Sequence, residues 1–545
     1  MIESDPSSSS SYLEPSKGLT DGRLVALVAL VLFVLGAWPL LLVDLPPFQD
    51  IPNHVAIAHM IAHPDLYPEF AFNGLYKSNS ALTLWFYLLG GHGLFGAARG
   101  FVALVLAVTA LALPVFVLRF AGRRALWPAM GFAWPLVHSF AVVMGFLNYA
   151  LGFGLSLILL AVLDRQRERA TSARGAAIVA LSVVLWYAHP FPLAVVGALC
   201  GLHCATRASW PERRAAALAL LLPLAPAGLL ALVAAQHHLI KAEHANTQTA
   251  GTFVYLNPWE ILAHLWTDVS GALTRFGSMT LVPALLLPIL VWNQRPPDRP
   301  LLSNRALAML AVAYVGLPVM LSNWWYLQCR LVPFLWAGLL LRLPRQLPRP
   351  LVIGLAACAL SFSAVTGIDY LRLDRDRAEF TAGMSAVPTR ATLLPLLFEK
   401  SKTGDFVATL THAWGYYTVG KDTSAALVFA AERSYPITYR TFPPRALIPP
   451  ALDRFAEQYA TPAQVCKIVQ HFPIDAACTA LWREIWDAFW QQAEPRFGHL
   501  LVWAMPAEAR PLIPARYHRV FASGDLEIYA REPREYKTIL DNAPR

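Results

Sequence analysis

The segment Ala81–Leu163 contains no aspartate and no glutamate, and this absence limits the possible folds more than any other feature of the sequence. An ordinary soluble domain has about 25% charged residues. The whole chain of 545 residues has 14% charged and 56% hydrophobic residues. These proportions exclude a disordered chain, a nucleic-acid-binding tail and a disulfide-rich secreted domain. They indicate a polytopic α-helical membrane protein.

The acidic residues divide the chain into regions. Residues 1–80 contain 8 acids, residues 81–369 contain 8 and residues 370–545 contain 19. We therefore predict a soluble α/β domain of ordinary size at the C-terminus. The predicted parts are a disordered cytoplasmic tail (1–22), a transmembrane domain (23–369, with outer loop 44–100) and a C-terminal extracytoplasmic α/β domain (370–545). Within the last part we predict strands at Phe406–Thr411, His499–Trp503 and Tyr517–Tyr529, and an amphipathic helix at Leu481–Ala493.

The apolar runs and the basic residues between them predict the topology. A run of about 17–25 apolar residues can cross a bilayer, and cytoplasmic loops are enriched in Lys and Arg. Eleven spans with a cytoplasmic N-terminus place the basic loops in the cytoplasm and the C-terminal domain outside. Ala81–Phe95 is then an interfacial or re-entrant helix, and if it spans, every later loop changes sides. The predicted spans are Arg23–Val43, Phe101–Leu118, Leu126–Val143, Leu147–Leu163, Ala176–Tyr187, Pro192–Cys204, Ala215–Ala235, Met279–Trp292, Ala306–Leu321, Leu331–Leu341 and Leu351–Thr366.

The first outer loop contains the strongest candidate for catalysis. Asp50 precedes Pro52, and proline suits the first turn of a helix. The sequence therefore predicts a short helix that ends before Pro64, with Asp50 at its positive end. That position favours an ionised carboxylate, which can act as a general base or help to hold a divalent cation. A helix-capping role explains the same pattern, and the local sequence does not separate the two readings.

The first span and loop 44–100 resemble the GT-C membrane glycosyltransferases, the superfamily of protein mannosyltransferases and lipid A aminoarabinose transferases. The resemblance rests on Gln49-Asp50, on the predicted helix Asn53–His63, on the aromatic run Leu84–Leu89 and on Phe95-Gly96 before the next span. It extends loosely over the pattern of spans and the outer C-terminal domain. No motif identifies the sugar.

The resemblance implies a transferase that moves a sugar from a polyprenyl-phosphate carrier to an envelope glycan, lipid or protein on the outer face. Asp50 would deprotonate the acceptor, and the anomeric configuration would invert. The leaving phosphate needs cationic partners, and the candidates by position are His189, Arg330 and Lys77. No cofactor is implied with certainty, and a divalent cation is compatible with the loop acid. The expected location is a bacterial inner membrane, with no nucleic-acid partner.

Five further residues complete the predicted substrate-binding set. Asp44, Asn53 and His54 belong to the same loop as Asp50, and Glu260, on a later outer loop, is a reserve base. Relatives often carry a second acid after the third span, where this chain has Asn148, an amide that forms hydrogen bonds but cannot act as a base. We predict no metal ligands, because His59 and His63 lack the acid of an HExxH motif.

Two questions stay open at this level. The sequence does not show whether Cys466 and Cys478 form a disulfide bond. It is also compatible with a transporter or lipid-linked glycan flippase, and with an O-antigen polymerase or ligase-like enzyme that uses loop Gln236–Ser278. The low content of acids in the predicted spans and the lack of a visible inverted repeat favour the glycosyltransferase over the transporter.

Overall fold

The protein was analysed as a computed structural model. The structure describes residues 18–532. Within this range it leaves out residues 76, 243–252, 258, 262–264, 266–270, 275–276, 281, 283–299, 322–323, 400–406, 431–434 and 470–475. The chain divides into two compact units. Unit 1 comprises residues 1–42, 76–82 and 99–369, and unit 2 comprises residues 43–75, 83–98 and 370–545. Most of the predicted outer loop 44–100 therefore belongs with the C-terminal residues.

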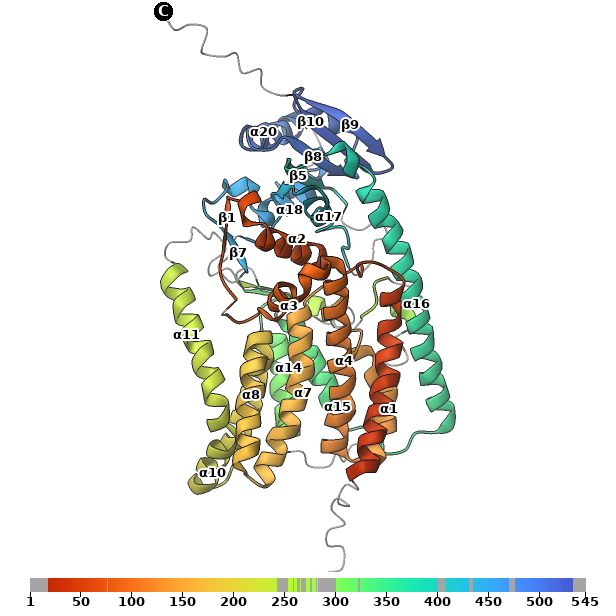
Figure 1. The fold of residues 1–545 in the computed structure, drawn as a ribbon, viewed down its shortest axis with the longest axis vertical. Coiled ribbons are helices and arrows are strands. Elements are labelled where there is room, and N and C mark those ends of the chain that lie inside the picture. The colour runs from red at the N-terminus through yellow and green to blue at the C-terminus, as the bar shows by residue number, and fades with distance from the viewer. Residues whose placement is uncertain are drawn as a thin grey trace, which may run out of the picture. The chain divides into compact units, whose positions relative to one another are not determined.

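Unit 1 consists mainly of long apolar helices, several of which run side by side (Figure 1). A small antiparallel sheet accompanies them, with β2 (Phe253–Val254), β3 (Met320–Leu321) and β4 (Trp324–Trp325) in that order. The helices are α1 (Gly18–Ala37), α4 (Leu94–Ala121), α5 (Arg123–Ala133), α6 (Phe140–Val143), α7 (Leu147–Glu168), α8 (Ser172–Ala188), α9 (Pro190–Ala205), α10 (Trp210–Leu220), α11 (Ala225–Ala242), α14 (Asn304–Gly316), α15 (Val332–Leu340) and α16 (Arg349–Thr381).

The helices agree with the predicted class of helical membrane proteins. Within the described part of the chain, six helical stretches are long and apolar enough to cross a bilayer. They are Asp21–Leu41, Leu94–Ala121, Arg123–Val143, Leu147–Glu168, Trp210–Ala234 and Arg349–Ala386. Shorter apolar helices occupy Ser172–Ala188, Pro190–Ala205 and Gln328–Leu340. The predicted span Met279–Trp292 lies largely outside the described residues.

Near the first spans, the start of α1 differs from the prediction, whereas the length of α3 (Ala81–Leu89) agrees with it. Helix α1 begins at Gly18, so residues 18–22 are helical although the tail was predicted to be disordered; residues 1–17 lie outside the description. Helix α3 has 9 residues, about 13 Å of helix, which is too short to cross a bilayer. The short helix agrees with the interfacial or re-entrant interpretation of Ala81–Phe95.

Unit 2 is built on a five-stranded sheet in the order β6-β5-β8-β10-β9. β5 pairs in parallel with β6 and β8, whereas β8, β10 and β9 are antiparallel neighbours. A separate two-stranded sheet pairs β1 with β7. The elements are β1 (Phe70–Phe72), β5 (Thr392–Leu397), β6 (Ser424–Ala425), β7 (Ile437–Tyr439), β8 (His499–Trp503), β9 (Tyr517–Ser523), β10 (Leu526–Arg531), α2 (Ile51–Ala62), α17 (Gly415–Lys421), α18 (Pro449–Gln458), α19 (Pro462–Ile468) and α20 (Ala476–Ala493).

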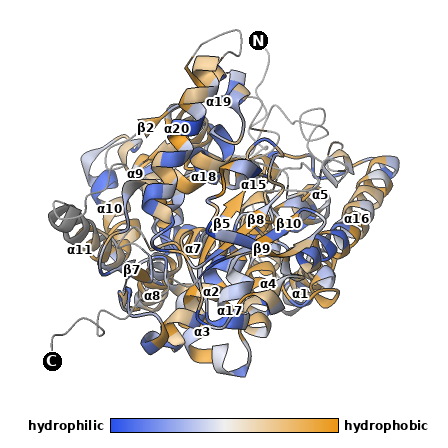
Figure 2. Cartoon of the chain, turned by 90° about the horizontal axis from the view of Figure 1, so that it is seen from above, coloured by the Kyte–Doolittle hydropathy of each residue, from blue (hydrophilic) through white to orange (hydrophobic). Residues whose placement is uncertain are grey.

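The predicted elements of the C-terminal region can be compared with the structure one by one. Strand His499–Trp503 is confirmed as β8, and the predicted amphipathic helix is part of α20, which carries hydrophobic and hydrophilic residues side by side (Figure 2). Tyr517–Tyr529 is a hairpin and not one strand, because the chain turns at Gly524, whose φ of 55° suits glycine. The strand predicted at Phe406–Thr411 is wrong, since residues 407–411 form turns.

Candidate functional site

Asp50 is the residue that precedes helix α2, as predicted, but its side chain does not cap the helix. Pro52 occupies the first turn, and no side-chain capping hydrogen bond is present at Asp50. The residue is 7% exposed. Its Oδ1 lies 3.5 Å from Nε2 of His412, whose side chain is buried to a similar extent. A carboxylate in this position is buried beside an imidazole and close to the positive end of a helix.

His412 is a site residue that the sequence analysis missed. It lies in a turn of the C-terminal region, where no spacing motif marks it. Two features hold that turn against the start of α2. The N–H of Ala408 donates to Oε1 of Gln49 at 3.3 Å. A Cβ on Gly415 would lie 2.3 Å from the carbonyl oxygen of Pro52, so only glycine allows this close approach of α17 and α2.

The ring of Phe429 joins the predicted loop residues to His412. It packs against the imidazole of His412, with ring centroids 4.7 Å apart, and against His54 at 6.3 Å. The N–H of Phe429 donates to Oδ1 of Asn53 at 3.5 Å, and Asn53 is fully buried. We call Asp50, Asn53, His54, His412 and Phe429 the acid–histidine cluster.

Desolvation decides the protonation of one member of this cluster. Burial lowers the pKa of His54 to about 4, because a low-dielectric environment disfavours the imidazolium ion. His54 is therefore neutral at pH 7. A neutral imidazole can accept or donate a hydrogen bond without adding charge beside Asp50.

His59 and His63 lie further along α2 and form a separate contact. Nε2 of His59 lies 2.8 Å from Oδ1 of Asp422. The ring centroids of His59 and His63 are 4.4 Å apart. Burial lowers the pKa of His59, while Asp422 acts in the opposite direction. Among the described residues, no group of three or more His, Cys, Asp or Glu is arranged to hold a metal ion.

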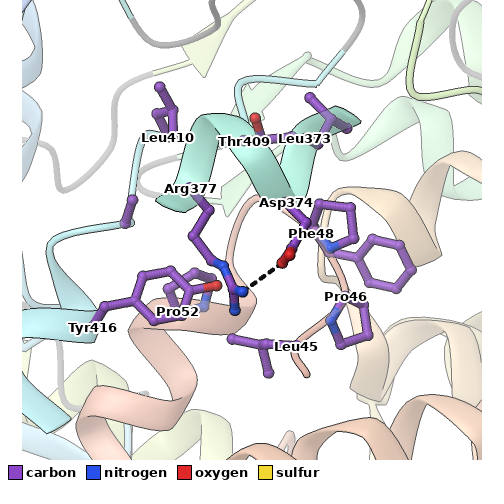
Figure 3. Close-up of a pocket in the computed structure, with 12 residues that line it drawn as sticks. Leu45, Pro46, Phe48, Pro52, Leu373, Asp374, Arg377, Thr409, Leu410 and Tyr416 are labelled. Atoms are coloured by element: carbon purple, nitrogen blue, oxygen red, sulfur yellow. Dashed lines mark ion pairs between the residues drawn. The ribbon is translucent and has the colours of Figure 1, made fainter. Parts of the chain in front are cut away.

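Asp44 is exposed. The next residue, Leu45, lines a small cavity in unit 2. Arg377 forms an ion pair with Asp374 at 2.5 Å inside this cavity (Figure 3), and its guanidinium carbon lies 5.3 Å from the centre of the Tyr416 ring. The cavity has a volume of about 10 Å³, which is room for about one water molecule. It is therefore too small to bind a sugar.

His189 and Arg330, both predicted to meet the phosphate, are in contact within unit 1. Nη1 of Arg330 lies 2.8 Å from Nε2 of His189. The guanidinium group lies over the rings of Phe146 and Tyr149, at 5.1 and 5.6 Å, and Arg330 is 8% exposed. Aromatic faces attract a cation in this position, so Arg330 is buried with its charge supported by neighbouring rings.

The hydrogen bonds of His189 place two donors around one ring. The N–H of Phe191 donates to Nδ1 of His189 at 3.1 Å, while Nη1 of Arg330 faces Nε2. Arg330 can only donate, so Nε2 accepts in the contact with Arg330, and His189 holds the guanidinium group in place.

The other predicted residues of unit 1 have different surroundings. The side chain of Asn148 accepts from the N–H of Leu82 at 2.8 Å and donates to the carbonyl of Asn79 at 2.9 Å. Its amide therefore binds the backbone just before α3 and in the first turn of α3. Lys77 is half-buried, and burial lowers the pKa of its amine to about 8.

Glu260 forms a helix-capping arrangement on the surface. It is exposed, and its Oε2 accepts from the N–H of Asn257 at 2.8 Å. The side chain of Asn257 accepts in return from the N–H of Glu260 at 2.9 Å. This reciprocal pair is a capping box, which gives Glu260 a structural role.

The question of the two C-terminal cysteines is answered by the structure. Cys466 of α19 and Cys478 of α20 form a disulfide bond, with Cα atoms 5.7 Å apart. Both residues are buried. The bond links two helices that flank a segment outside the described residues.

Comparisons with known proteins add nothing to this description. No family model matches the chain, and no curated protein matches its sequence.

Proposed function

We propose that the protein is a membrane glycosyltransferase of the GT-C type. It moves a sugar from a polyprenyl-phosphate donor to an acceptor hydroxyl of an envelope glycan, lipid or protein. The proposal includes eleven spans, an extracytoplasmic C-terminal domain and a bacterial inner membrane. The observation that carries it is the position of Asp50, which is buried at the start of α2, does not cap that helix and faces His412.

The proposed reaction is a single displacement. Asp50 accepts the proton of the acceptor hydroxyl while the oxygen attacks the anomeric carbon from the side opposite the phosphate. The bond between the anomeric carbon and the phosphate oxygen breaks, and the phosphate leaves with the electron pair. The sugar is therefore transferred with inversion. A positioned base of this kind contributes about 10²–10⁴-fold to a rate.

The other candidate residues are assigned from their own contacts. Arg330 is proposed to stabilise the charge of the donor phosphate, because it is a buried cation, and His189 beside it is proposed to hold its guanidinium group by accepting from it at 2.8 Å. Asn53 and His54 are proposed to orient the acceptor near Asp50, since they belong to the acid–histidine cluster. Asn148 and Glu260 are already used in hydrogen bonds that hold the backbone.

Transfer in washed membranes tests the proposal. Labelled sugars on a panel of polyprenyl phosphates are supplied to membranes with the wild-type protein, with Asp50→Asn or with Asp65→Asn. Asp65 is an exposed acid of the same loop, so its variant controls for the loss of a charge. We expect transfer by the wild type and by Asp65→Asn, and a loss of at least 100-fold in Asp50→Asn.

Other outcomes count against parts of the proposal. Equal transfer by the wild type and by Asp50→Asn, at equal protein levels, would remove Asp50 as the base. Substrate flux across the membrane without covalent transfer would favour the transporter or flippase. Loss of transfer from changes in loop Gln236–Ser278, with Asp50 dispensable, would favour the polymerase or ligase-like enzyme.

A further inference from the structure

Helix α10 and the start of α11 form the most exposed of the apolar helical stretches. In Trp210–Ala234 only 17% of the apolar window is buried inside the protein. Large apolar side chains project outward along the stretch, each more than half exposed: Leu218, Leu222, Leu229, Leu232 and Val233. In a membrane protein such a face is covered by acyl chains or by another protein.

One end of this stretch is strongly basic. Residues 164–174, between α7 and α8, and residues 207–214, before and in α10, together contain seven arginines and three acids. Helix α10 packs against α7 and α9, so the two segments lie at the same end of these helices (Figure 1). We call them the basic end. Its arginines are Arg165, Arg167, Arg169, Arg174, Arg207, Arg213 and Arg214.

Two of the three acids are neutralised from within the protein. Arg119 of α4 forms ion pairs with Asp164 and with Glu168, both at 2.5 Å. Asp164 also pairs with Arg167 at 3.1 Å. Arg119 supplies one positive charge from outside the basic end, and the seven arginines of the basic end exceed its three acids, so the basic end keeps its excess of positive charge.

Hydrogen bonds to the backbone fix the two arginine-bearing segments. Nη1 of Arg174 donates to the carbonyl of Arg165 at 3.3 Å, and Nε of Arg213 donates to the carbonyl of Arg207 at 2.9 Å. Arg169 and Arg214 are exposed beside them. Trp210, at the start of α10, is 74% exposed, as tryptophan is at the level of lipid headgroups.

From this arrangement we propose that the basic end and the exposed face of α10–α11 bind a phospholipid with an anionic headgroup. The headgroup phosphate is held by Arg169, Arg213 and Arg214, while the acyl chains lie along Leu218 and Leu222. The same surface carries a cationic end, an interfacial tryptophan and an apolar face, in the order in which a lipid presents its parts. A second copy of the chain fits less well, since a symmetric contact would bring the two basic ends together.

Lipid retention by the full-length protein tests this inference. The detergent-extracted protein is reconstituted in bilayers of phosphatidylcholine with a minority of phosphatidylglycerol, re-extracted and analysed for bound lipid by native mass spectrometry. We expect the wild type to be enriched in phosphatidylglycerol. The enrichment should fall about five-fold for each arginine lost in Arg213→Gln/Arg214→Gln, since a basic residue near an anionic surface contributes about this factor.

Matched variants separate charge from folding. Arg213→Lys/Arg214→Lys retains the charge and should retain the enrichment. Arg483→Gln/Arg496→Gln removes two exposed arginines of unit 2 and should leave it unchanged. Equal retention of both lipids by the wild type would overturn the inference. A native mass that corresponds to two copies of the chain without lipid would also overturn the inference. Equal thermal stabilisation of the protein by inorganic phosphate and by phosphatidylglycerol would overturn it as well.

Discussion

Oδ1 of Asp50 lies 3.5 Å from Nε2 of His412, although most of the chain separates the two residues. An imidazole beside a carboxylate can orient it by a hydrogen bond and can share its proton. The contact explains why an acid at the start of a helix does not accept a hydrogen bond from that helix. It also makes the C-terminal region part of the site that carries the candidate base.

His412→Gln tests this relationship in the proposed reaction. The variant keeps a hydrogen-bond donor near Asp50 but cannot be protonated. We expect kcat to fall by about 10-fold or more, less than in Asp50→Asn, and the pH dependence of kcat to change shape, because the group beside the proposed base can no longer take up a proton. His63→Gln is the control, since His63 is an exposed histidine that follows the end of α2. An unchanged pH profile in His412→Gln would contradict the pairing.

Gly415→Ala tests the packing of α17 on α2. The new Cβ would lie 2.3 Å from the carbonyl oxygen of Pro52, so a backbone must move. We expect a loss of stability of about 1–3 kcal/mol, seen as a lower midpoint of thermal unfolding, together with lower activity. Gly197→Ala is the matched control, because nothing lies within 4 Å of its Cβ position in α9. A midpoint in Gly415→Ala equal to that of the wild type would exclude the close approach.

The disulfide bond predicts the thiol count of the protein. Four cysteines, Cys200, Cys204, Cys329 and Cys358, lie outside the disulfide bond. Alkylation of the denatured, unreduced protein should therefore modify four thiols, and reduction should release two more. Replacing Cys466 and Cys478 by alanine should lower stability by about 2–4 kcal/mol, because the loop between them is no longer closed in the unfolded chain. Six reactive thiols before reduction would contradict the bond.

The pKa of His54 predicts a loss of stability in weak acid. The folded protein binds the proton only near pH 4, whereas the unfolded chain binds it near pH 6.5. Between these values the unfolded state binds more protons, so stability falls as the pH falls from about 6.5 to 4. His54→Gln should reduce the difference between the unfolding midpoints at pH 7 and pH 5. The same pH dependence in both proteins would show that His54 does not cause it.

Some of the structure could be predicted because it depends on nearby residues. Asp50 and Pro52 determine where α2 begins, since proline and an acid favour the first turn of a helix. The continuous run of apolar residues in β8 and the apolar face of α20 are local patterns. The strand predicted at Phe406–Thr411 failed, because a short apolar run does not distinguish a strand from a buried turn.

By itself, the sequence determined that the chain contains segments long and apolar enough to cross a membrane, and where its candidate base lies. Hydropathy and charge are properties of local segments, so a transmembrane helix can be identified without knowledge of its neighbours. Only the tertiary structure decided that His412 faces Asp50, that Phe429 packs between His412 and His54, and that Cys466 pairs with Cys478. These contacts depend on how distant segments pack, and no pattern of spacing along the chain encodes the distances between them.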